Sequence, residues 1–326
     1  MINTIERDVH VLRYFSSFVS VSEGRVIHVS DPTLRFCPLS SHLYKSFKDA
    51  DGADKEALKL EIKSAIESKI RDYGFFTPQR KLLHGETVIA FGASEMLMFA
   101  LKKGSIDAAV IVCDGAGTVV TDNAEVVQGI GARMNSLLLT SPIKEIITRL
   151  KELNCHVVFA NALIDQVEGV EKAIAAGYKK IAVTVSGHDS EILKSIRRLE
   201  SSGNVTVTIL VVCTTGISEE KIADIRNHAD VVWSCASWDI RKTIGAIALL
   251  QISKQIPVFV LTHKGIDFIG AYAYDNVQIS GLNAKKRYLI SNETGGRRVR
   301  LGANNCFLRE ETLPVLSGKS FAMAIA

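Results

Sequence analysis

KIAVTVSGHDSEILKSIRRLESSGNVTVTILVV, residues 180–212, is the stretch that decides the fold class of this chain. It holds two runs of strand length that are rich in Val and Ile, residues 180–185 and 205–212. Between them, residues 190–200 place apolar side chains three to four positions apart, which predicts a helix. Near-continuous apolar strands are typical of parallel sheets buried on both faces. The stretch therefore predicts a strand–helix–strand unit with a right-handed crossover.

The same rhythm continues on both sides of this unit. Strands are also predicted over residues 87–91, 108–112, 156–160, 231–233 and 257–261, and helices over 95–102, 143–153, 167–176, 219–228 and 240–254. This alternation indicates an α/β fold with a largely parallel sheet and flanking helices, Rossmann-like and doubly wound. A (β/α) barrel needs only one more strand and stays an alternative. The long segment 115–142 interrupts the barrel rhythm and favours the open sheet.

The two ends of the chain differ from this core. Residues 17–22 and 25–29 predict a hairpin around a glycine turn, and residues 54–73 predict an amphipathic helix that Gly74 ends. From Tyr272 onward, alternation and glycine-rich turns predict a β-rich cap. We therefore expect an N-terminal hairpin and helix region over 1–85, an α/β core domain over 86–270 and a C-terminal cap over 271–326.

The composition is that of an ordinary globular protein and excludes several classes. Of 326 residues, 47% are hydrophobic and 23% charged, and the net charge is only +4, with Lys and Arg spread along the chain. Such a balance does not suggest nucleic-acid binding. The charged start argues against a signal peptide, and no run approaches the ~20 apolar residues that span a bilayer. We expect a cytoplasmic protein that does not bind membranes.

Cysteines and histidines gather after the predicted strands. The carboxyl ends of strands collect ligands in both open sheets and barrels. Thiolates of Cys113, Cys213 and Cys235 are candidate ligands for zinc or an iron–sulfur cluster. Cys113, Asp114, His188 and His263 are candidate catalytic groups, as nucleophile or acid–base residues. Because Cys often ends a strand as a small buried hydrophobe and no CxxC pair exists, purely structural cysteines remain the alternative.

Glycines at the same strand ends predict an anion-binding site. Gly92 and Ser94 form a tight strand-to-helix turn, and Gly115 and Gly117 follow the next strand. Such turns let backbone amides approach a phosphate or carboxylate, and Arg133 could clamp the same small anionic ligand. Neither turn is a GxGxxG or Walker loop, so turn formation alone also accounts for the glycines.

Several stretches together resemble one known family. They are Phe36-Cys37-Pro38-Leu39, Ile70-Arg-Asp-Tyr-Gly-Phe-Phe-Thr77, Phe91-Gly-Ala-Ser-Glu95, Cys113-Asp-Gly-Ala-Gly-Thr-Val-Val120, Gln128-Gly-Ile-Gly-Ala-Arg133 and Thr140-Ser-Pro-Ile143. In these stretches the chain resembles the methanogenesis marker 8 proteins, a domain of unknown function in methanogenic archaea. The resemblance implies a cytoplasmic role linked to methanogenesis, and it brings no catalytic residues with it.

Two hypotheses from different classes follow. In the first, the chain is a small-molecule- or metal-binding enzyme or redox factor that acts at the carboxyl ends of the core strands. In the second, it is a non-catalytic accessory or assembly protein that binds a methanogenesis enzyme through its hairpin region and cap. The turn with Arg297, Arg298 and Arg300 is the dense basic cluster that such an interface could use.

Overall fold

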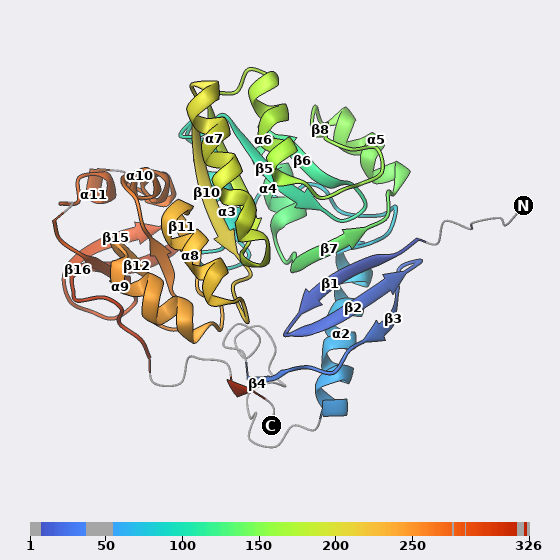
Figure 1. Cartoon of the computed structure of the whole chain (residues 1–326), viewed down its shortest axis with the longest axis horizontal. Helices are drawn as coiled ribbons and strands as arrows, with labels where there is room; N and C mark the ends of the chain where they lie inside the picture. Colours follow the sequence, from blue (N-terminus) through green and yellow to red (C-terminus); the bar gives the residue numbers. More distant parts are fainter. Residues whose placement is uncertain (1–7, 37–54, 276, 284, 318–322, 325–326) are drawn as a thin grey trace, which may run out of the picture.

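The fold is known from a computed structural model, which describes residues 8–36, 55–275, 277–283, 285–317 and 323–324. Cys37, Pro38 and Leu39 of the stretch quoted above lie outside them. The main feature is an 11-stranded sheet in the order β15-β16-β14-β12-β13-β11-β10-β9-β5-β6-β8 (Figure 1). Its strands are β5 (Ala108–Cys113), β6 (Gly117–Thr121), β8 (His156–Val157), β9 (Lys180–Ser186), β10 (Thr206–Val212), β11 (Val231–Trp233), β12 (Leu250–Ile252), β13 (Val258–Val260), β14 (Tyr288–Ser291), β15 (Arg297–Leu301) and β16 (Asn304–Glu310).

The sheet is open and mixed, which corrects the expectation of a largely parallel one. Parallel pairing joins β5, β9, β10 and β11, and also β12 with β14, but the other six neighbouring pairs are antiparallel. The physical reason is that short turns, which can join only antiparallel neighbours, replace crossover helices at several places. The barrel alternative is wrong, because β15 and β8 remain as two separate edges. The α/β class itself is confirmed.

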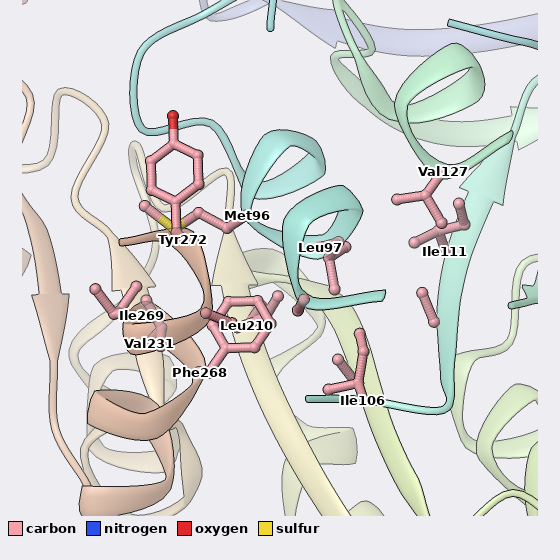
Figure 2. Packing of buried hydrophobic residues seen from close by; sticks show 14 of the residues in the cluster. Met96, Leu97, Ile106, Ile111, Val127, Leu210, Val231, Phe268, Ile269 and Tyr272 are labelled. Atoms are coloured by element: carbon pink, nitrogen blue, oxygen red, sulfur yellow. The ribbon is translucent and has the colours of Figure 1, made fainter. Parts of the chain in front are cut away.

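Helices cover both faces of the sheet, which gives the layered core that the sequence predicts. One face carries α3 (Ala93–Lys102), α4 (Ala124–Gly131), α5 (Lys144–Glu152), α10 (His263–Tyr272) and α11 (Val277–Ser280); the other carries α6 (Gln166–Ala175), η2 (Gly187–Ile192), α7 (Leu193–Gly203), α8 (Glu219–His228), η3 (Ile240–Ile244) and α9 (Gly245–Ile247). On the first face, Met96 and Leu97 pack with Tyr272 against the sheet (Figure 2). Fully burying such a side chain contributes about 1.5–3 kcal/mol.

A smaller module stands beside this core. Its four-stranded sheet has the order β3-β2-β1-β7, from β1 (His10–Tyr14), β2 (Ser17–Ser22), β3 (Arg25–Val29) and β7 (Ser136–Thr140), and α2 (Lys55–Tyr73) packs on one face. β4 (Leu34–Phe36) and β17 (Met323–Ala324) pair separately. β1 pairs antiparallel with β7, a strand from the middle of the chain, which ties the module to the core.

Local predictions held where the pattern was long and failed where it was short. The hairpin and the helix over 54–73 are confirmed as β2–β3 and α2. The strand predicted over 87–91 is wrong, because these residues form an irregular turn in which Phe91 has a φ of 62°. The helix predicted over 240–254 ends at Ile247, and β12 follows it.

The cap strands β14, β15 and β16 continue the main sheet through the pairing of β14 with β12. The division of the chain near residues 85 and 270 stays a prediction. Among the described residues, no helix combines the length and the apolar character that crossing a bilayer requires.

Candidate functional site

A large cavity lies along the carboxyl ends of the core strands. Its volume is about 1320 Å³, above the roughly 300–1,000 Å³ of common small-molecule sites. The floor comes from the last residues of β5, β9, β10 and β11 and from the positions just after them. One wall belongs to α2 and residues 133–137, the opposite wall to the loops 253–256, 291–293 and 303–306, and the loop 88–95 lines the cavity as well. The cavity thus lies at the edge where the sequence predicted a site.

The loop 88–95 is held by a buried carboxylate that sequence reasoning missed. Glu95 Oε1 accepts hydrogen bonds from the amides of Val88 (3.1 Å) and Ile89 (3.0 Å) and from Gln128 Nε2 (2.9 Å). A Cβ at Gly92 would lie 2.0 Å from Glu95 Oε2. Glycine at position 92 is therefore required by the carboxylate that fixes the start of α3.

Gly92 and Ser94, two predicted cofactor-binding residues, both line the cavity. The Ser94 hydroxyl donates to Glu95 Oε2 at 3.0 Å, so in this state it supports the loop. Gly92 precedes the first residue of α3, and the loop that contains it lines the cavity. Amides at the start of a helix favour a negative charge.

Two cations form the basic part of the wall. The Arg133 guanidinium lies over the Tyr73 ring at 4.1 Å, and Lys69 Nζ donates to the Arg133 carbonyl oxygen at 2.6 Å and to Asn135 Oδ1. Burial, and after it the charge of Arg133, lower the pKa of Lys69 to about 7. An added anion would offset both effects, because it attracts the protonated form.

Lys69 carried no signal in the sequence. It is one of several Lys residues on an amphipathic helix, and only the antiparallel pairing of β1 with β7 brings residues 133–137 beside that helix. Arg133, by contrast, was predicted, and the structure places it on the wall of the cavity.

Two predicted cysteines lie on the floor of the cavity. Cys213 follows β10 and Cys235 follows β11, and both line it. Burial, then the nearby Cys235, raise the pKa of Cys213, whereas the Ser136 hydroxyl and the Arg13 guanidinium act in the opposite direction. In the closed cavity Cys213 is thus a protonated thiol at neutral pH.

Backbone strain concentrates at this cavity. Twelve non-glycine residues in the described part of the chain have a positive φ, and six of them line it: Phe15, Phe91, Arg133, Cys213, Cys235 and Ser253. Such conformations cost on the order of 1–3 kcal/mol each and cluster at binding sites. The concentration therefore favours a functional cavity.

His188 lies beside the cavity and does not line it. Its ring accepts from Arg13 Nη1, the same residue that acts on Cys213. Burial, and after it the Arg13 charge, lower the pKa of His188. A neutral ring that contacts a cation suits a positioning role better than the acid–base role predicted from the sequence.

Four other predicted residues form the tight turn between β5 and β6. Cys113 and Asp114 are fully buried, and Asp114 Oδ1 pairs with Arg80 Nε at 2.9 Å. A Cβ at Gly115 would lie 2.8 Å from Ile146, and one at Gly117 would lie 2.3 Å from the Ala162 carbonyl oxygen. The expectation that this turn faces a ligand is corrected, since β6 returns antiparallel to β5 and buries it.

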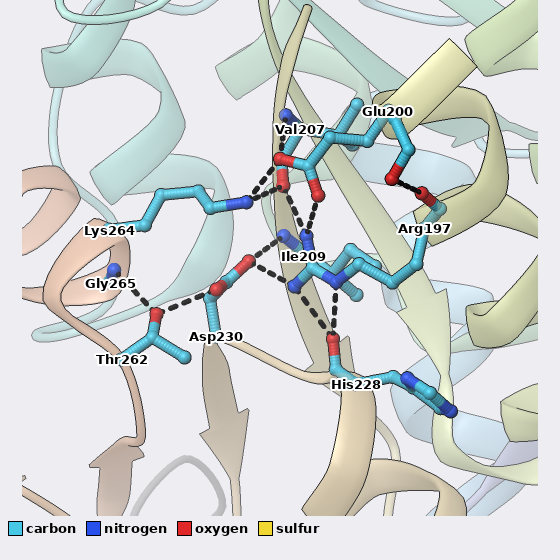
Figure 3. Close-up of polar contacts among 10 residues, drawn as sticks. Arg197, Glu200, Val207, Ile209, His228, Asp230, Thr262, Lys264 and Gly265 are labelled. Carbon is cyan, nitrogen blue, oxygen red and sulfur yellow. Dashed lines mark hydrogen bonds and ion pairs between the residues drawn. The ribbon is translucent and has the colours of Figure 1, made fainter.

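His263 lies at the opposite edge of the sheet, which corrects its grouping with the other strand-end residues. β13 runs antiparallel to β11, so its carboxyl end meets the amino ends of β10 and β11. There the neighbours of His263 belong to an ionic network (Figure 3): Thr262 Oγ1 donates to Asp230 Oδ1 at 2.6 Å, and Lys264 Nζ binds Glu200.

The three cysteines do not assemble into a metal site. Cys113 is buried in the β5–β6 turn, away from the cavity that Cys213 and Cys235 line. Across the described residues, no group of three or more His, Cys, Asp or Glu side chains is placed to hold a metal ion. The residues present therefore do not fit the predicted zinc or iron–sulfur centre.

Comparisons with known proteins agree in extent with this core. Residues 10–273 match a family described as "Uncharacterized protein conserved in archaea (DUF2099)". The chain is also similar to "Uncharacterized protein MJ0054" of Methanocaldococcus jannaschii, with 39% identity over 272 residues, which cover 82% of this chain and 92% of that protein. The family match includes every strand whose end forms the floor of the cavity.

Proposed function

The chain belongs to the family of uncharacterized proteins conserved in archaea (DUF2099), and from that premise we propose that it binds an anionic small molecule in the cavity at the strand ends. The observation that carries the proposal is the pair of cations, Lys69 and Arg133, on the cavity wall. A volume of about 1320 Å³ suits a ligand of cofactor size.

Among the described residues, no ion pair joins Lys69 or Arg133 to a carboxylate, and Asp72, which lines the same wall, pairs with Arg71 at 3.0 Å. Lys69 and Arg133 repel each other, and the contacts of both within the described residues are to carbonyl oxygens and aromatic rings. A phosphate or carboxylate between them would supply the missing negative charge, and a bidentate contact to Arg133 would orient it. Residues 88–95 line the same cavity.

The rest of the lining suits an apolar or aromatic body on the ligand. Phe91, Ile111 and Trp233 line the cavity between the basic wall and the cap loops. Trp233 is fixed, because its Nε1 donates to the Phe91 carbonyl oxygen at 2.8 Å. A ligand with one charged end and a flat or apolar body would match this distribution.

The setting belongs to the same proposal. The resemblance to the methanogenesis marker proteins, together with a relative from Methanocaldococcus jannaschii, supports a cytoplasmic role associated with methanogenesis. An enzyme would convert the bound molecule, whereas an accessory protein would bind it without chemical change.

Isothermal titration calorimetry with inorganic pyrophosphate tests the anion site. Removing one charge-assisted hydrogen bond costs about 1.5–3 kcal/mol, so Lys69→Met and Arg133→Met are each expected to weaken binding by about 10- to 150-fold. Lys81→Met is the matched control, because Lys81 also lies over the Tyr73 ring but does not line the cavity. Equal affinity in the wild-type protein and both cavity variants would overturn the proposal.

A further inference from the structure

A second chemical feature occupies the floor of the same cavity. Five cysteines lie in the part of the chain that the structure describes, and two of them, Cys213 and Cys235, are half-buried, whereas Cys113, Cys155 and Cys306 are buried. The two half-buried thiols are also the two that follow adjacent strands at the cavity floor.

The strand pairing brings these two positions close together. β10 and β11 pair in parallel, with Leu210 opposite Val231 and Val211 opposite Val232. Adjacent strands lie about 4.8 Å apart, and the Cα atoms of disulfide-bonded cysteines lie roughly 4.4–6.8 Å apart. Extended by two residues, this register places Cys213 opposite Ser234, and Cys235 is the next residue. One step of about 3.3 Å along a strand and about 4.8 Å across the pair leaves the two Cα atoms within that bridging range.

The surroundings of Cys213 act on its thiol in two directions. Burial and the neighbouring Cys235 raise the pKa of Cys213, whereas the Ser136 hydroxyl and the Arg13 guanidinium partly offset that rise. Both cysteines have a left-handed backbone, with φ of 58° and 46°. Both thiols line the cavity, so a small disulfide inside it could reach them.

We propose that Cys213 and Cys235 form a redox-active dithiol pair that exchanges with a low-molecular-weight disulfide bound in the cavity. One thiolate attacks a sulfur of the disulfide, which releases one small thiol and leaves a mixed disulfide on the protein. The second cysteine then attacks the protein sulfur and releases the other small thiol. In total, the two cysteines lose two electrons and two protons, and the small disulfide gains both.

The other described cysteines give a contrast within the same chain. Cys306 touches the cavity but is 1% exposed, so its sulfur is less accessible than those of the half-buried pair. Cys155 is buried beside the Thr121 hydroxyl, with Sγ to Oγ1 at 3.2 Å. These thiols are expected to stay reduced under conditions that oxidise the pair.

The test is peptide mapping by mass spectrometry after the full chain is treated anaerobically with hydroxyethyl disulfide. We expect wild-type protein to yield a Cys213–Cys235 linked peptide, and Cys213→Ser to retain a stable mixed disulfide at Cys235. Cys306→Ser is the matched control and should behave like wild type. If wild-type protein gave no linked peptide, or a link to another cysteine, the proposal would be overturned. This outcome depends on the wild-type protein alone, so it stands even if a variant fails to fold.

This inference does not rest on the anion site. Lys69→Met removes a cation from the α2 wall, not from the floor that carries the cysteines, and should leave the linked peptide unchanged. Loss of pyrophosphate binding with intact disulfide formation, or the reverse, would therefore separate the two proposals.

Discussion

Replacing Asp114 by Ala should strongly lower the free energy of unfolding, because Asp114 forms a buried ion pair with Arg80. Arg80 is 1% and Asp114 0% exposed, and Asp114 Oδ2 also accepts from the Phe76 amide at 2.7 Å. Removing one partner of a buried pair costs about 3–5 kcal/mol, and an unsatisfied buried amide adds about 1–3 kcal/mol. We therefore expect a loss of at least about 4 kcal/mol.

Urea denaturation followed by circular dichroism measures this loss. Glu310→Ala is the matched control, because its ion pair with Lys286 is 57% and 49% exposed and similar in length, 2.6 Å. Solvent screens such a surface pair, so its loss should change stability little. If Asp114→Ala unfolded within about 1 kcal/mol of wild type but lost pyrophosphate binding, the structural reading would be refuted and Asp114 would return to the site.

Two further predictions concern other parts of the fold. Burial would raise the pKa of Glu200, but hydrogen bonds from Lys264, the Val207 amide and Arg197 outweigh it and lower the pKa below its usual 4.5. Because the unfolded chain then takes up the proton at a higher pH than the folded chain, the free energy of unfolding should fall as the pH drops below about 4.5. Denaturation measured over this pH range should show a smaller fall for Glu200→Gln. Gly117→Ala should destabilise the chain more than Gly104→Ala in the same denaturation assay. Both glycines have a similar positive φ, 68° and 66°, but only at Gly117 would the added Cβ lie within 4 Å of other backbone atoms. Equal losses of stability in the two variants would refute this steric argument.

The sequence predicts the long, regular elements well, and the structure explains where it failed. α2, α6 and α8 follow their apolar periodicity, and their ends differ from the predicted ranges by one residue at most. β6 and β12 were missed because both are short. β6 begins within a glycine-rich turn, and β12 lies in a segment whose periodicity predicts a helix. The direction of β13 decided the place of His263, and strand direction leaves no mark on periodicity.

The candidate site could be predicted in its position but only partly in its residues. The rule that ligands gather at the carboxyl ends of strands located Cys213 and Cys235, which come after β10 and β11. It also pointed to Gly92, which lines the cavity although an irregular loop takes the place of the predicted strand before it. Lys69 and Glu95 were missed because their roles depend on long-range contacts, to residues 133–135 and to Gln128. Asp114 was misassigned because its partner Arg80 comes from a loop more than thirty positions earlier.

Hydrogen–deuterium exchange of the full chain, with and without saturating pyrophosphate, tests the location of the anion site most directly. Ligand contact slows amide exchange where local opening is suppressed. We predict slower exchange in residues 88–95 and 133–137, which line the cavity around Lys69 and Arg133. Slowing confined to the basic turn at residues 297–300, at a concentration where calorimetry detects binding, would contradict the account and favour the cap as the binding surface.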